Sequence, residues 1–445
     1  MSTFDIRKPL LNPYLALGLA ILGAASMVYY HQGLFIPRSK TMLAARGLGN
    51  GYSFGNDFYQ VWLTSRALSE KQNPYSPEMT KEIQVGLYGR PLDPNRASDP
   101  VDQRAFPYPA FTDLLFWPVC QLPFTIVRIA ILCALLALTI AAIPLWVQAM
   151  GWNLHWTWIA LISGLTLSSY PALEGLFAGQ LGLLVSFLLA ATLFSLRRER
   201  FLAAGILLGL AAMKPQSTLL VTLYLLLWAI HQWNQRKSFV VGLLATDLLL
   251  LGASLVILPH WISSWLGTVL AYSHYTTPRL IREVIPSFLP DAVAGPTSFL
   301  LTIIAVVLSL LLIFQSRKSD LRSSEFWLTF SLLLSVTAVV LLPGQAVYDH
   351  LILVPALLVI WQERYCLYQS GRVSRLLLAL VSIVFLWPWV TAACLLLLRL
   401  FATRAVFNSP VLLSLPIRTA ASLPFAVLAA LVWIWLNRRE RKAAS

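Results

Sequence analysis

The sequence has very few charged residues. Only 12% of its 445 residues are charged, against about 25% in an ordinary soluble globular protein. Its four cysteines show no CxxC spacing, which argues against a disulfide framework or a zinc site and favours buried packing residues. It has no Walker loop and no GxGxxG motif after a strand, so nothing indicates a nucleotide-binding site.

The net charge of +14 does not indicate nucleic-acid binding. The cations form short clusters between apolar runs, with no basic face and no motif of a nucleic-acid-binding fold. Short basic clusters of this kind are typical of the cytoplasmic loops of membrane proteins. We therefore expect no nucleic-acid partner, and we interpret the cations as topology signals.

Long apolar runs fill the rest of the chain. The sequence is 58% hydrophobic, and apolar runs recur from end to end at lengths close to the roughly 20 residues that cross a bilayer. This predicts an all-α polytopic integral membrane protein. There is no visible internal repeat and no separate soluble domain, so residues 1–445 are expected to form a single membrane domain.

The basic clusters predict the orientation of the chain. The positive-inside rule places these clusters in the cytoplasm, and an even number of crossings must join each successive pair. The result is about 12 membrane segments, some of them short or re-entrant, in the inner or plasma membrane of the cell, with both termini cytoplasmic. The clusters are Arg7/Lys8, Arg197/Arg198/Arg200, Arg236/Lys237, Arg317/Lys318/Arg322, Arg364/Arg372/Arg375 and Arg438/Arg439/Arg441/Lys442.

The expected segments are 11–30, 112–148, 155–172, 180–196, 201–213, 216–230, 239–258, 297–315, 326–342, 349–362, 375–398 and 422–437. The run 112–148 is too long for one span, so we expect it to begin as a helix on the outer surface. Three loops remain outside the membrane, at 31–111, 259–296 and 399–421, with short turns near 173–180 and 343–349.

One hairpin is too short for ordinary spans. Between Arg200 and Arg236 the chain must cross and return, yet "FLAAGILLGLAAM" reaches only about 20 Å as a helix, against a hydrocarbon core of about 30 Å. Its tip is Lys214-Pro215-Gln216. Lys214 is therefore expected near or below the outer membrane boundary, where it either snorkels to the surface or binds an anion.

The first outer loop contains an acidic residue at a predicted helix start. After Asp57, the residues Phe58, Val61, Trp62 and Leu68 recur at helical spacing. This predicts an amphipathic helix that begins at Asp57 and lies along the membrane surface. An Asp in this position is either an N-cap or a functional carboxylate.

Further polar residues fall in turns and loops on the same face. They are Glu174, Gln180, Arg282, Tyr348, Asp349 and His350. Together with Asp57 and Lys214, they lie at the depth of the lipid headgroups. This arrangement predicts a site for an anionic lipid substrate.

The acidic segment "LDPNRASDPVDQ" resembles a metal cluster only superficially. Its acids, Asp93, Asp99 and Asp102, are widely spaced among prolines, which favours a solvated loop. We therefore predict no metal site and no cofactor.

Several motifs together resemble one enzyme family. They are "NDFYQVWLTSRALSEKQNPYSP", "FPYPAF", "GLFAGQLGLLVSFLLAATLFSLRRERFLAAGILLGLAAMKPQ" and "YDHLILVPALL". In this combination the chain resembles the GT-C superfamily glycosyltransferases of family 87 (the DUF2029 type), which include polyprenyl-phosphomannose-dependent mannosyltransferases. The resemblance runs through most of the chain and implies a GT-C-type fold.

The resemblance also implies an activity. It implies an inverting hexosyltransferase, with mannose as the expected sugar, that uses a polyprenyl-monophosphate donor and a lipid or glycan acceptor on the extracytoplasmic face. Asp57 matches the family's first-loop acid and would be the general base. Lys214 and His350 match positions expected to meet the donor phosphate, and Arg282 is a further candidate cation.

The remaining site candidates are residues that could contact substrate. They are Tyr59, Trp62, Tyr108, Glu174, Gln180, Tyr348 and Asp349. An interfacial belt explains the aromatic residues equally well. The expected partners are the lipid-linked sugar donor, a glycolipid or glycan acceptor, and membrane lipids.

Two alternative functions remain open. A transporter would also contain short, interrupted hairpins and buried charges, but it predicts an internal repeat and does not explain the long first outer loop. A lipid-linked glycan ligase, or another GT-C transferase with a different donor, would share the architecture. A requirement for a divalent cation would favour such an enzyme, because a diphosphate donor favours a metal site.

Overall fold

The computed structural model describes residues 13–49, 53–275, 280–285, 288–344, 346–401 and 409–444. Most of the chain in these ranges folds into helices, and these ranges contain no β-strand. The predicted all-α polytopic membrane fold is therefore confirmed. Arg7 and Lys8, used above for the orientation, lie outside the described residues.

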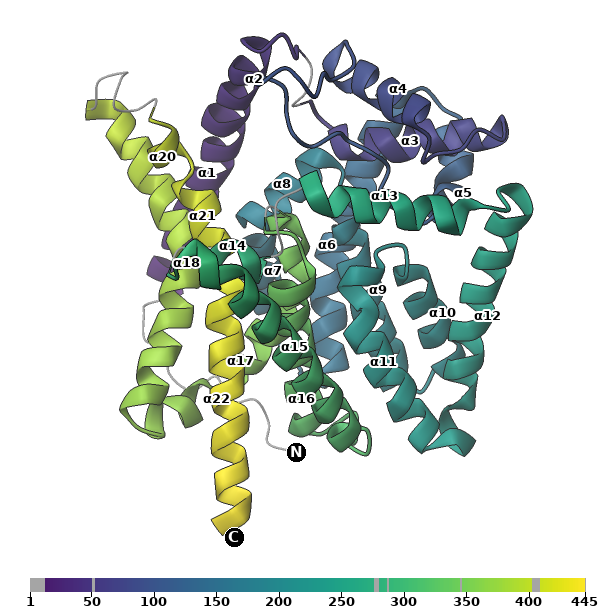
Figure 1. Cartoon of the computed structure of the whole chain (residues 1–445). Coiled ribbons are helices and arrows are strands. Elements are labelled where there is room, and N and C mark those ends of the chain that lie inside the picture. Colours follow the sequence, from purple (N-terminus) through teal and green to yellow (C-terminus); the bar gives the residue numbers. More distant parts are fainter. Residues whose placement is uncertain are drawn as a thin grey trace.

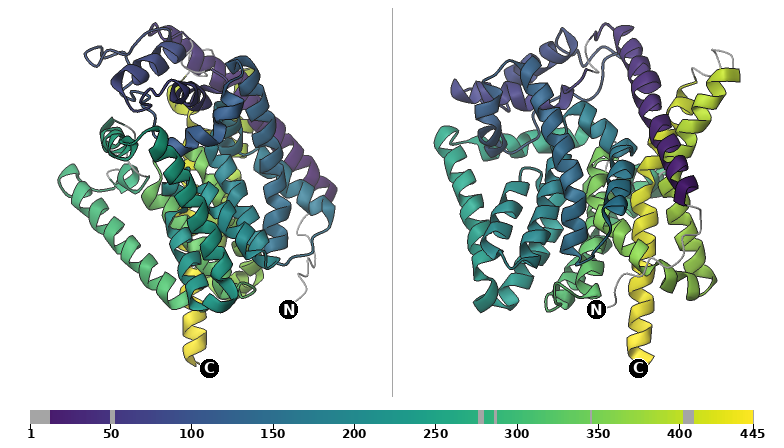
Figure 2. Two further views of the ribbon diagram at one scale, coloured as in Figure 1. Left: turned by 90° about the vertical axis from the view of Figure 1, so that its right-hand side faces the viewer. Right: turned by 180° about the vertical axis from the view of Figure 1, so that it is seen from behind.

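Long apolar helices pack side by side into a bundle (Figures 1 and 2). Eight helices in the described ranges are long and apolar enough to cross a membrane. They are α1 (Pro13–Tyr29) with η1 (Tyr30–Phe35) and α2 (Ile36–Ala44), α6 (Phe124–Ala149), α12 (Trp233–Ile257), α15 (Asp291–Ser316), α16 (Ser324–Val336) with η3 (Thr337–Leu341), η4 (Val347–Leu353) with α17 (Val354–Gln369), α18 (Arg372–Phe401), and α21 (Leu415–Ala421) with α22 (Leu423–Ala444).

Shorter and broken helices complete the bundle. Helices α8 (Tyr170–Ala178) and α9 (Leu181–Arg197) meet at an angle of 116°, as a broken span or a re-entrant loop would. The short apolar helices are α5 (Ala110–Cys120), α7 (Trp156–Leu167), α10 (Phe201–Ala211) and α11 (Pro215–His231). Every expected segment thus contains a helix, and the overlong run 112–148 divides into α5 and α6.

The first span is longer than predicted. It was expected to end at Tyr30, but the helix continues through η1 and α2 as far as Ala44. His31 lies just past the expected end of the span, but it is fully buried and hydrogen-bonded to Glu174, so it does not end the helix. The outer loop therefore begins near residue 45, and not at residue 31.

The helix junctions that carry the basic clusters lie at one end of the bundle. The α9–α10, α11–α12, α15–α16 and α17–α18 junctions lie at the same end as the C-terminus (Figure 1). Ion pairs link some of them: Arg322 lies 3.8 Å from Glu199, and Arg438 lies 2.6 Å from Glu363. An even number of crossings between successive basic clusters, as predicted, would place these junctions at the same end of the bundle.

The opposite end is covered by helices that lie across the bundle. They are α3 (Asn56–Ser69), α4 (Pro77–Tyr88) and α13 (Trp261–Tyr275), with the short α14 (Leu280–Val284) and α20 (Pro410–Leu413) nearby (Figure 1). Helix α3 packs on α5, where Asp113 accepts hydrogen bonds from Thr64 at 2.8 Å and from Ser65 at 3.3 Å. This buried contact holds the second half of α3 against α5.

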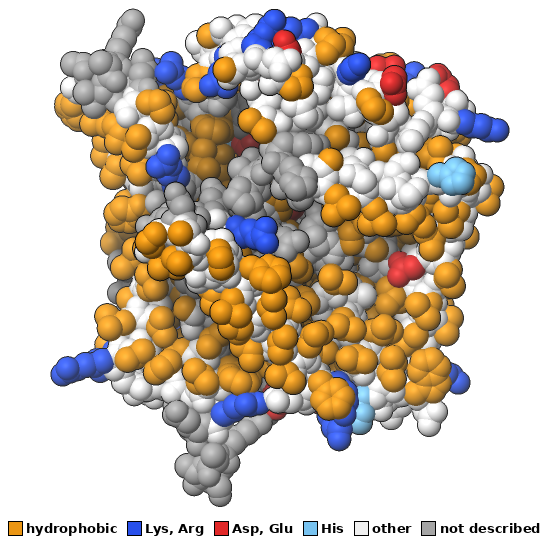
Figure 3. Space-filling view, in the orientation of Figure 1, with side chains coloured by type: hydrophobic (Ala, Val, Ile, Leu, Met, Phe, Trp, Pro, Cys, Tyr) orange, Lys and Arg blue, Asp and Glu red, His pale blue; other side chains and the backbone are white. Residues whose placement is uncertain are grey.

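The prediction that the cysteines are buried is wrong for three of the four. Cys120 is buried, but Cys133, Cys366 and Cys394 are exposed, and none of the four forms a disulfide within the described residues. Membrane helices turn much of their apolar surface outward to lipid, so an apolar run does not imply burial inside the protein. Figure 3 shows the resulting band of hydrophobic side chains across the middle of one face.

Backbone-to-backbone packing holds the short α10 against α12. A Cβ atom on Gly205 would lie 2.1 Å from the carbonyl oxygen of Phe239, and one on Gly242 would lie 2.4 Å from that of Leu202. Only glycine allows this approach. Because α10 is held in this way, Lys214, which follows its end, stays recessed within the bundle.

Gly205→Leu should therefore destabilise the protein. Overpacking typically costs about 1–3 kcal/mol, and a clash with rigid backbone should fall at the upper end of this range. The measurement is the thermal unfolding midpoint of the purified protein in detergent. Gly252→Leu is the matched control, because Gly252 is exposed and a Cβ atom there meets nothing within 4 Å. Equal midpoints for the two variants would contradict the packing argument.

Candidate active site

A polar cavity lies at the end of the bundle that α3 and α13 cover. Its volume is about 230 Å³, far more than the roughly 10–15 Å³ that one water molecule needs. Its walls come from α3, the segment before α5, α8, the α10–α11 junction, α13, and η4 with the segment before it. The predicted site residues on its lining are Asp57, Tyr108, Glu174, Gln180, Lys214, Tyr348 and Asp349.

Two glycine turns bring the first two motifs together. Gly55 is the N-cap of α3 with φ +78°, and its N–H donates to the carbonyl of Phe177 at 2.8 Å. Gly179 is the C-cap of α8 with φ +73°, and a Cβ atom there would lie 2.9 Å from Cβ of Phe58. Both turns use the left-handed region that favours glycine. They place Asp57 beside Gln180.

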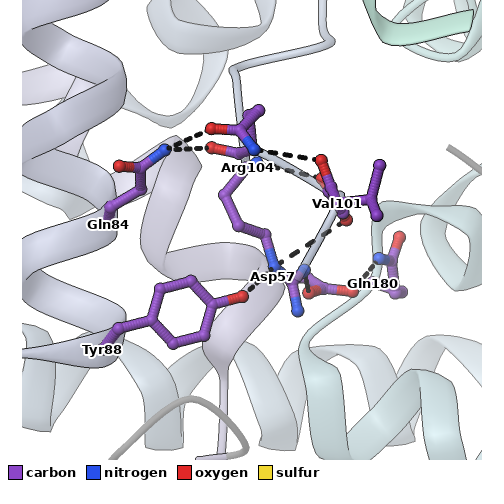
Figure 4. A network of polar contacts seen from close by, with 8 residues as sticks. Asp57, Gln84, Tyr88, Val101, Arg104 and Gln180 are labelled. Carbon is purple, nitrogen blue, oxygen red and sulfur yellow. Dashed lines mark hydrogen bonds and ion pairs between the residues drawn. The ribbon is translucent and has the colours of Figure 1, made fainter. Parts of the chain in front are cut away.

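The carboxylate of Asp57 is held by two side chains in the cavity. Oδ1 accepts a hydrogen bond from Nη1 of Arg104 at 2.9 Å, and Oδ2 accepts one from Nε2 of Gln180. Figure 4 shows Asp57 between these two partners. The N-cap of α3 is Gly55, with no side-chain cap. Asp57 is therefore not the cap residue.

Arg104 is a site residue that the sequence analysis missed. Its backbone is left-handed, with φ +58°, and its N–H donates to Oδ1 of Asp102 at 2.9 Å. Its Nε donates to the hydroxyl of Tyr88 at 3.1 Å. A left-handed non-glycine residue is strained, and these contacts hold it in place. No sequence pattern marks this conformation.

The acidic segment before Arg104 is an ordered loop. Arg90 donates to both oxygens of Asp99, at 2.5 and 2.7 Å, and these bonds hold the pKa of Asp99 well below its usual range. Asp102 lines the cavity, which the solvated-loop interpretation did not anticipate. No group of three His, Cys, Asp or Glu side chains suited to a metal ion occurs in the part of the chain that the structure describes. Metal independence stays a prediction.

Lys214 forms a buried ion pair with Asp349. Its Nζ lies 2.5 and 2.8 Å from the two carboxylate oxygens, and the two residues are 4% and 2% exposed. The ring of Tyr348 lies 5.2 Å from the same nitrogen. A Cβ atom on Gly182 would lie 2.0 Å from Oδ1 of Asp349, so glycine is needed there. Lys214 points inward, which excludes the snorkelling interpretation.

Gln180 joins this ion pair to Asp57. Its Oε1 lies 3.5 Å from Nζ of Lys214 and 3.4 Å from the hydroxyl of Tyr108, while its Nε2 donates to Asp57. Burial raises the pKa of Tyr108, so its hydroxyl stays protonated and can donate. A continuous row of contacts therefore runs from Asp349 through Lys214 and Gln180 to Asp57 and Arg104.

Tyr59 and Trp62, which were predicted to contact substrate, lie on a different face of α3 from Asp57. Tyr59 packs so closely on α4 that a Cβ atom on Gly86 would lie 2.0 Å from its hydroxyl oxygen. Trp62 donates from Nε1 to the carbonyl of Leu122 at 2.9 Å. At 100° per residue, both point well away from Asp57, whereas Gln60 shares its side and lines the cavity.

Two predicted cations also lie outside the cavity lining. Arg282 is exposed on α14. His350 is 3% exposed in η4, which packs against α21. Because η4 is a 3-10 helix, Asp349 and His350 point about 120° apart, and only Asp349 faces the cavity. The proposed phosphate contacts of His350 and Arg282 stay predictions.

Comparison with known proteins agrees with the motifs. The chain matches the family model of glycosyltransferase family 87 over residues 106–343, which is more than half of its length. The matched region contains Tyr108, Glu174, Gln180 and Lys214, while Asp57 and Asp349 lie outside it. No curated protein matches the chain. This multi-pass membrane protein belongs to glycosyltransferase family 87.

Proposed function

We propose that the protein transfers a hexose, with mannose as the expected sugar, from a polyprenyl-monophosphate donor to a hydroxyl of a lipid or glycan acceptor. The transfer inverts the anomeric centre and takes place at the extracytoplasmic face of the cell membrane, with both termini in the cytoplasm. The observation that carries the proposal is the row of contacts that places a carboxylate, Asp57, and a buried cation, Lys214, on one cavity.

The chemistry needs one base and a holder for the leaving group. The acceptor oxygen attacks C1 of the sugar from the face opposite the phosphate, the C1–O bond to the phosphate breaks, and Asp57 takes the hydroxyl proton. Each carboxylate oxygen of Asp57 has more than one lone pair, so its bonds to Arg104 and Gln180 leave room for the acceptor hydroxyl. The phosphate leaves with the bonding electrons and needs no acid.

Donors beside the cavity would stabilise the charge that grows on the phosphate. Lys214 directs two of its bonds to Asp349 and lies 3.5 Å from Gln180, so one ammonium hydrogen is weakly engaged. Nη2 of Arg104 makes no hydrogen bond among the described residues, although Arg104 binds through Nη1 and Nε. Fixed donors aimed at developing charge supply large rate effects in a site that excludes water.

The charges on the cavity wall limit where a phosphate can bind. Asp57, Asp102, Glu174 and Asp349 face the cavity, against Lys214 and Arg104. An anion would be repelled over most of the wall and attracted only where these two cations lie. We therefore place the donor phosphate between Lys214 and Arg104, with the prenyl chain directed to the lipid and C1 turned toward Asp57.

Asp57→Asn should abolish most of the turnover while leaving the protein folded. Loss of a general base typically costs roughly 10²–10⁴-fold in rate, so kcat should fall within that range while the donor Kd stays close to that of wild type. The measurement is the transfer of labelled sugar from a short-chain polyprenyl-phosphomannose, with the purified protein in nanodiscs.

Asp102→Asn is the matched control for this variant. Asp102 also faces the cavity beside Arg104, and an Asn side chain can still accept the Arg104 N–H. Its loss of kcat should be far smaller than that of Asp57→Asn. An equal loss of kcat in the two variants would contradict a special role for Asp57. Wild-type turnover by Asp57→Asn would exclude Asp57 as the general base.

The affinity for the donor phosphate should depend on the charge of Lys214. Lys214→Met alone leaves Asp349 buried without its partner, which typically costs about 3–5 kcal/mol of stability. The double variant Lys214→Met/Asp349→Asn removes both charges and should fold, yet bind the donor at least tenfold more weakly. The measurement is the donor Kd with thermal unfolding in parallel. A stable double variant with wild-type donor affinity would make the ion pair purely structural.

A further inference from the structure

A buried histidine of the first span lies behind the cavity wall. His31 in η1 is fully buried, and its Nε2 lies 2.8 Å from Oε2 of Glu174. Glu174 belongs to α8 and lines the cavity, with 15% of its side chain exposed. Polar residues within a membrane-spanning segment are costly and commonly mark functional positions. His31 and Glu174 therefore connect the first span to the site.

The neighbour of His31 sets its tautomer. The amide Nε2 of Gln32 lies 3.1 Å from Nδ1 of His31. An amide nitrogen can only donate, so Nδ1 accepts and the ring proton of the neutral imidazole resides on Nε2. That proton is donated to Glu174. A carboxylate that receives this bond has a fixed orientation, and its two oxygens together can accept several hydrogen bonds.

Aromatic rings lock the imidazole in place. The ring of His31 stacks on Phe35 at a centroid distance of 6.1 Å and meets the edges or faces of Tyr170 and Phe177 at 5.9 and 5.8 Å. It is carried by a π-helical segment, a form that often occurs at functional sites. The imidazole cannot turn away, so it holds Glu174 in one direction.

The position of Glu174 indicates what it can bind. Glu174 and Ala178 face the cavity one turn apart on α8, about 6 Å along the helix axis. Gln180, the partner of Asp57, follows directly after the C-cap of α8. Asp57 and Glu174 line the same cavity, so one molecule bound there can donate one hydroxyl to each carboxylate.

The end of the cavity that contains Glu174 should bind a neutral part of the substrates, because Glu174 is acidic. Glu174 would repel the donor phosphate, which we place at Lys214 and Arg104. Carboxylates are strong acceptors for hydroxyl donors. The acceptor approaches Asp57 from the side opposite the phosphate, and we assign the group that meets Glu174 to the acceptor.

We propose that Glu174 binds a second hydroxyl of the acceptor and that His31 is the positioning residue that orients Glu174 for this contact. The acceptor is then a sugar residue, with a hydroxyl for Asp57 and another for Glu174, and not a molecule with a single hydroxyl. The inference rests on the proposed function for the identity of the reaction, but not for the binding of the sugar.

Kinetics on the full-length protein in nanodiscs test the positioning role. We use short-chain polyprenyl-phosphomannose as donor and octyl α-mannoside as acceptor. Glu174→Gln and His31→Phe should raise the acceptor KM roughly tenfold or more with little change in donor KM. His31→Gln keeps an N–H donor and should recover part of the loss, whereas His31→Phe keeps only the aromatic packing.

A binding measurement distinguishes this inference from the proposed function. Saturation transfer from the protein to methyl α-mannoside requires no turnover, and the signal should weaken in both Glu174→Gln and His31→Phe. His260→Phe is the control, because His260 is exposed and lies outside the cavity lining. If no donor supports sugar transfer but both variants still weaken the saturation-transfer signal, the proposed function is wrong and the sugar-binding role of Glu174 is retained.

Other outcomes overturn the inference. Wild-type acceptor KM in monodisperse His31→Phe excludes the positioning role, and a selective rise in donor KM in Glu174→Gln moves Glu174 to the donor side. If His31→Phe does not fold, His31→Gln decides: an acceptor KM like that of Glu174→Gln would show that a donated hydrogen bond does not matter at this position. Transfer to octanol as efficient as transfer to octyl α-mannoside would also exclude a sugar acceptor.

Discussion

The buried ion pair between Lys214 and Asp349 is the contact on which the arrangement of the cavity depends. It joins the tip of the α10–α11 hairpin to η4, and it lies against the start of α9 at Gly182. Taking either charge out of water is costly unless the partner is present, so these three chain segments must meet. Gln180 extends the contact to Asp57, and the fold of the membrane bundle thereby fixes a residue in the first outer loop.

The cavity forms where regular helices stop. The α8–α9 bend, the α10–α11 junction, the start of α3 and the 3-10 segment η4 all contribute to it. At each of these points the backbone changes direction and can present a polar side chain inward. Irregular backbone is tolerated at membrane depth only where protein or a water-filled cavity surrounds it. The broken helices and the polar cavity are therefore two consequences of one arrangement.

Much of this organisation could be predicted from the sequence, because it depends on local length and pattern. The apolar runs predicted the helices, and the short "FLAAGILLGLAAM" segment predicted the recessed position of Lys214. Arg104 could not be predicted, because its role depends on a left-handed backbone and on tertiary contacts. The role of His31 could not be predicted either, because its contact with Glu174 joins two helices that are distant in sequence. Asp349 and His350 are adjacent in sequence, but their directions depend on the 3-10 geometry of η4.

The central claim is that one cavity holds the donor phosphate on Lys214 and Arg104 and presents C1 of its sugar to Asp57. A cryo-electron microscopy structure of the protein in nanodiscs with a non-hydrolysable polyprenyl-phosphonate sugar tests this claim most directly. The account predicts phosphonate oxygens within hydrogen-bonding distance of Lys214 and Arg104, with the anomeric carbon facing Asp57. A phosphonate bound at His350 or Arg282, with the sugar away from Asp57, would contradict it.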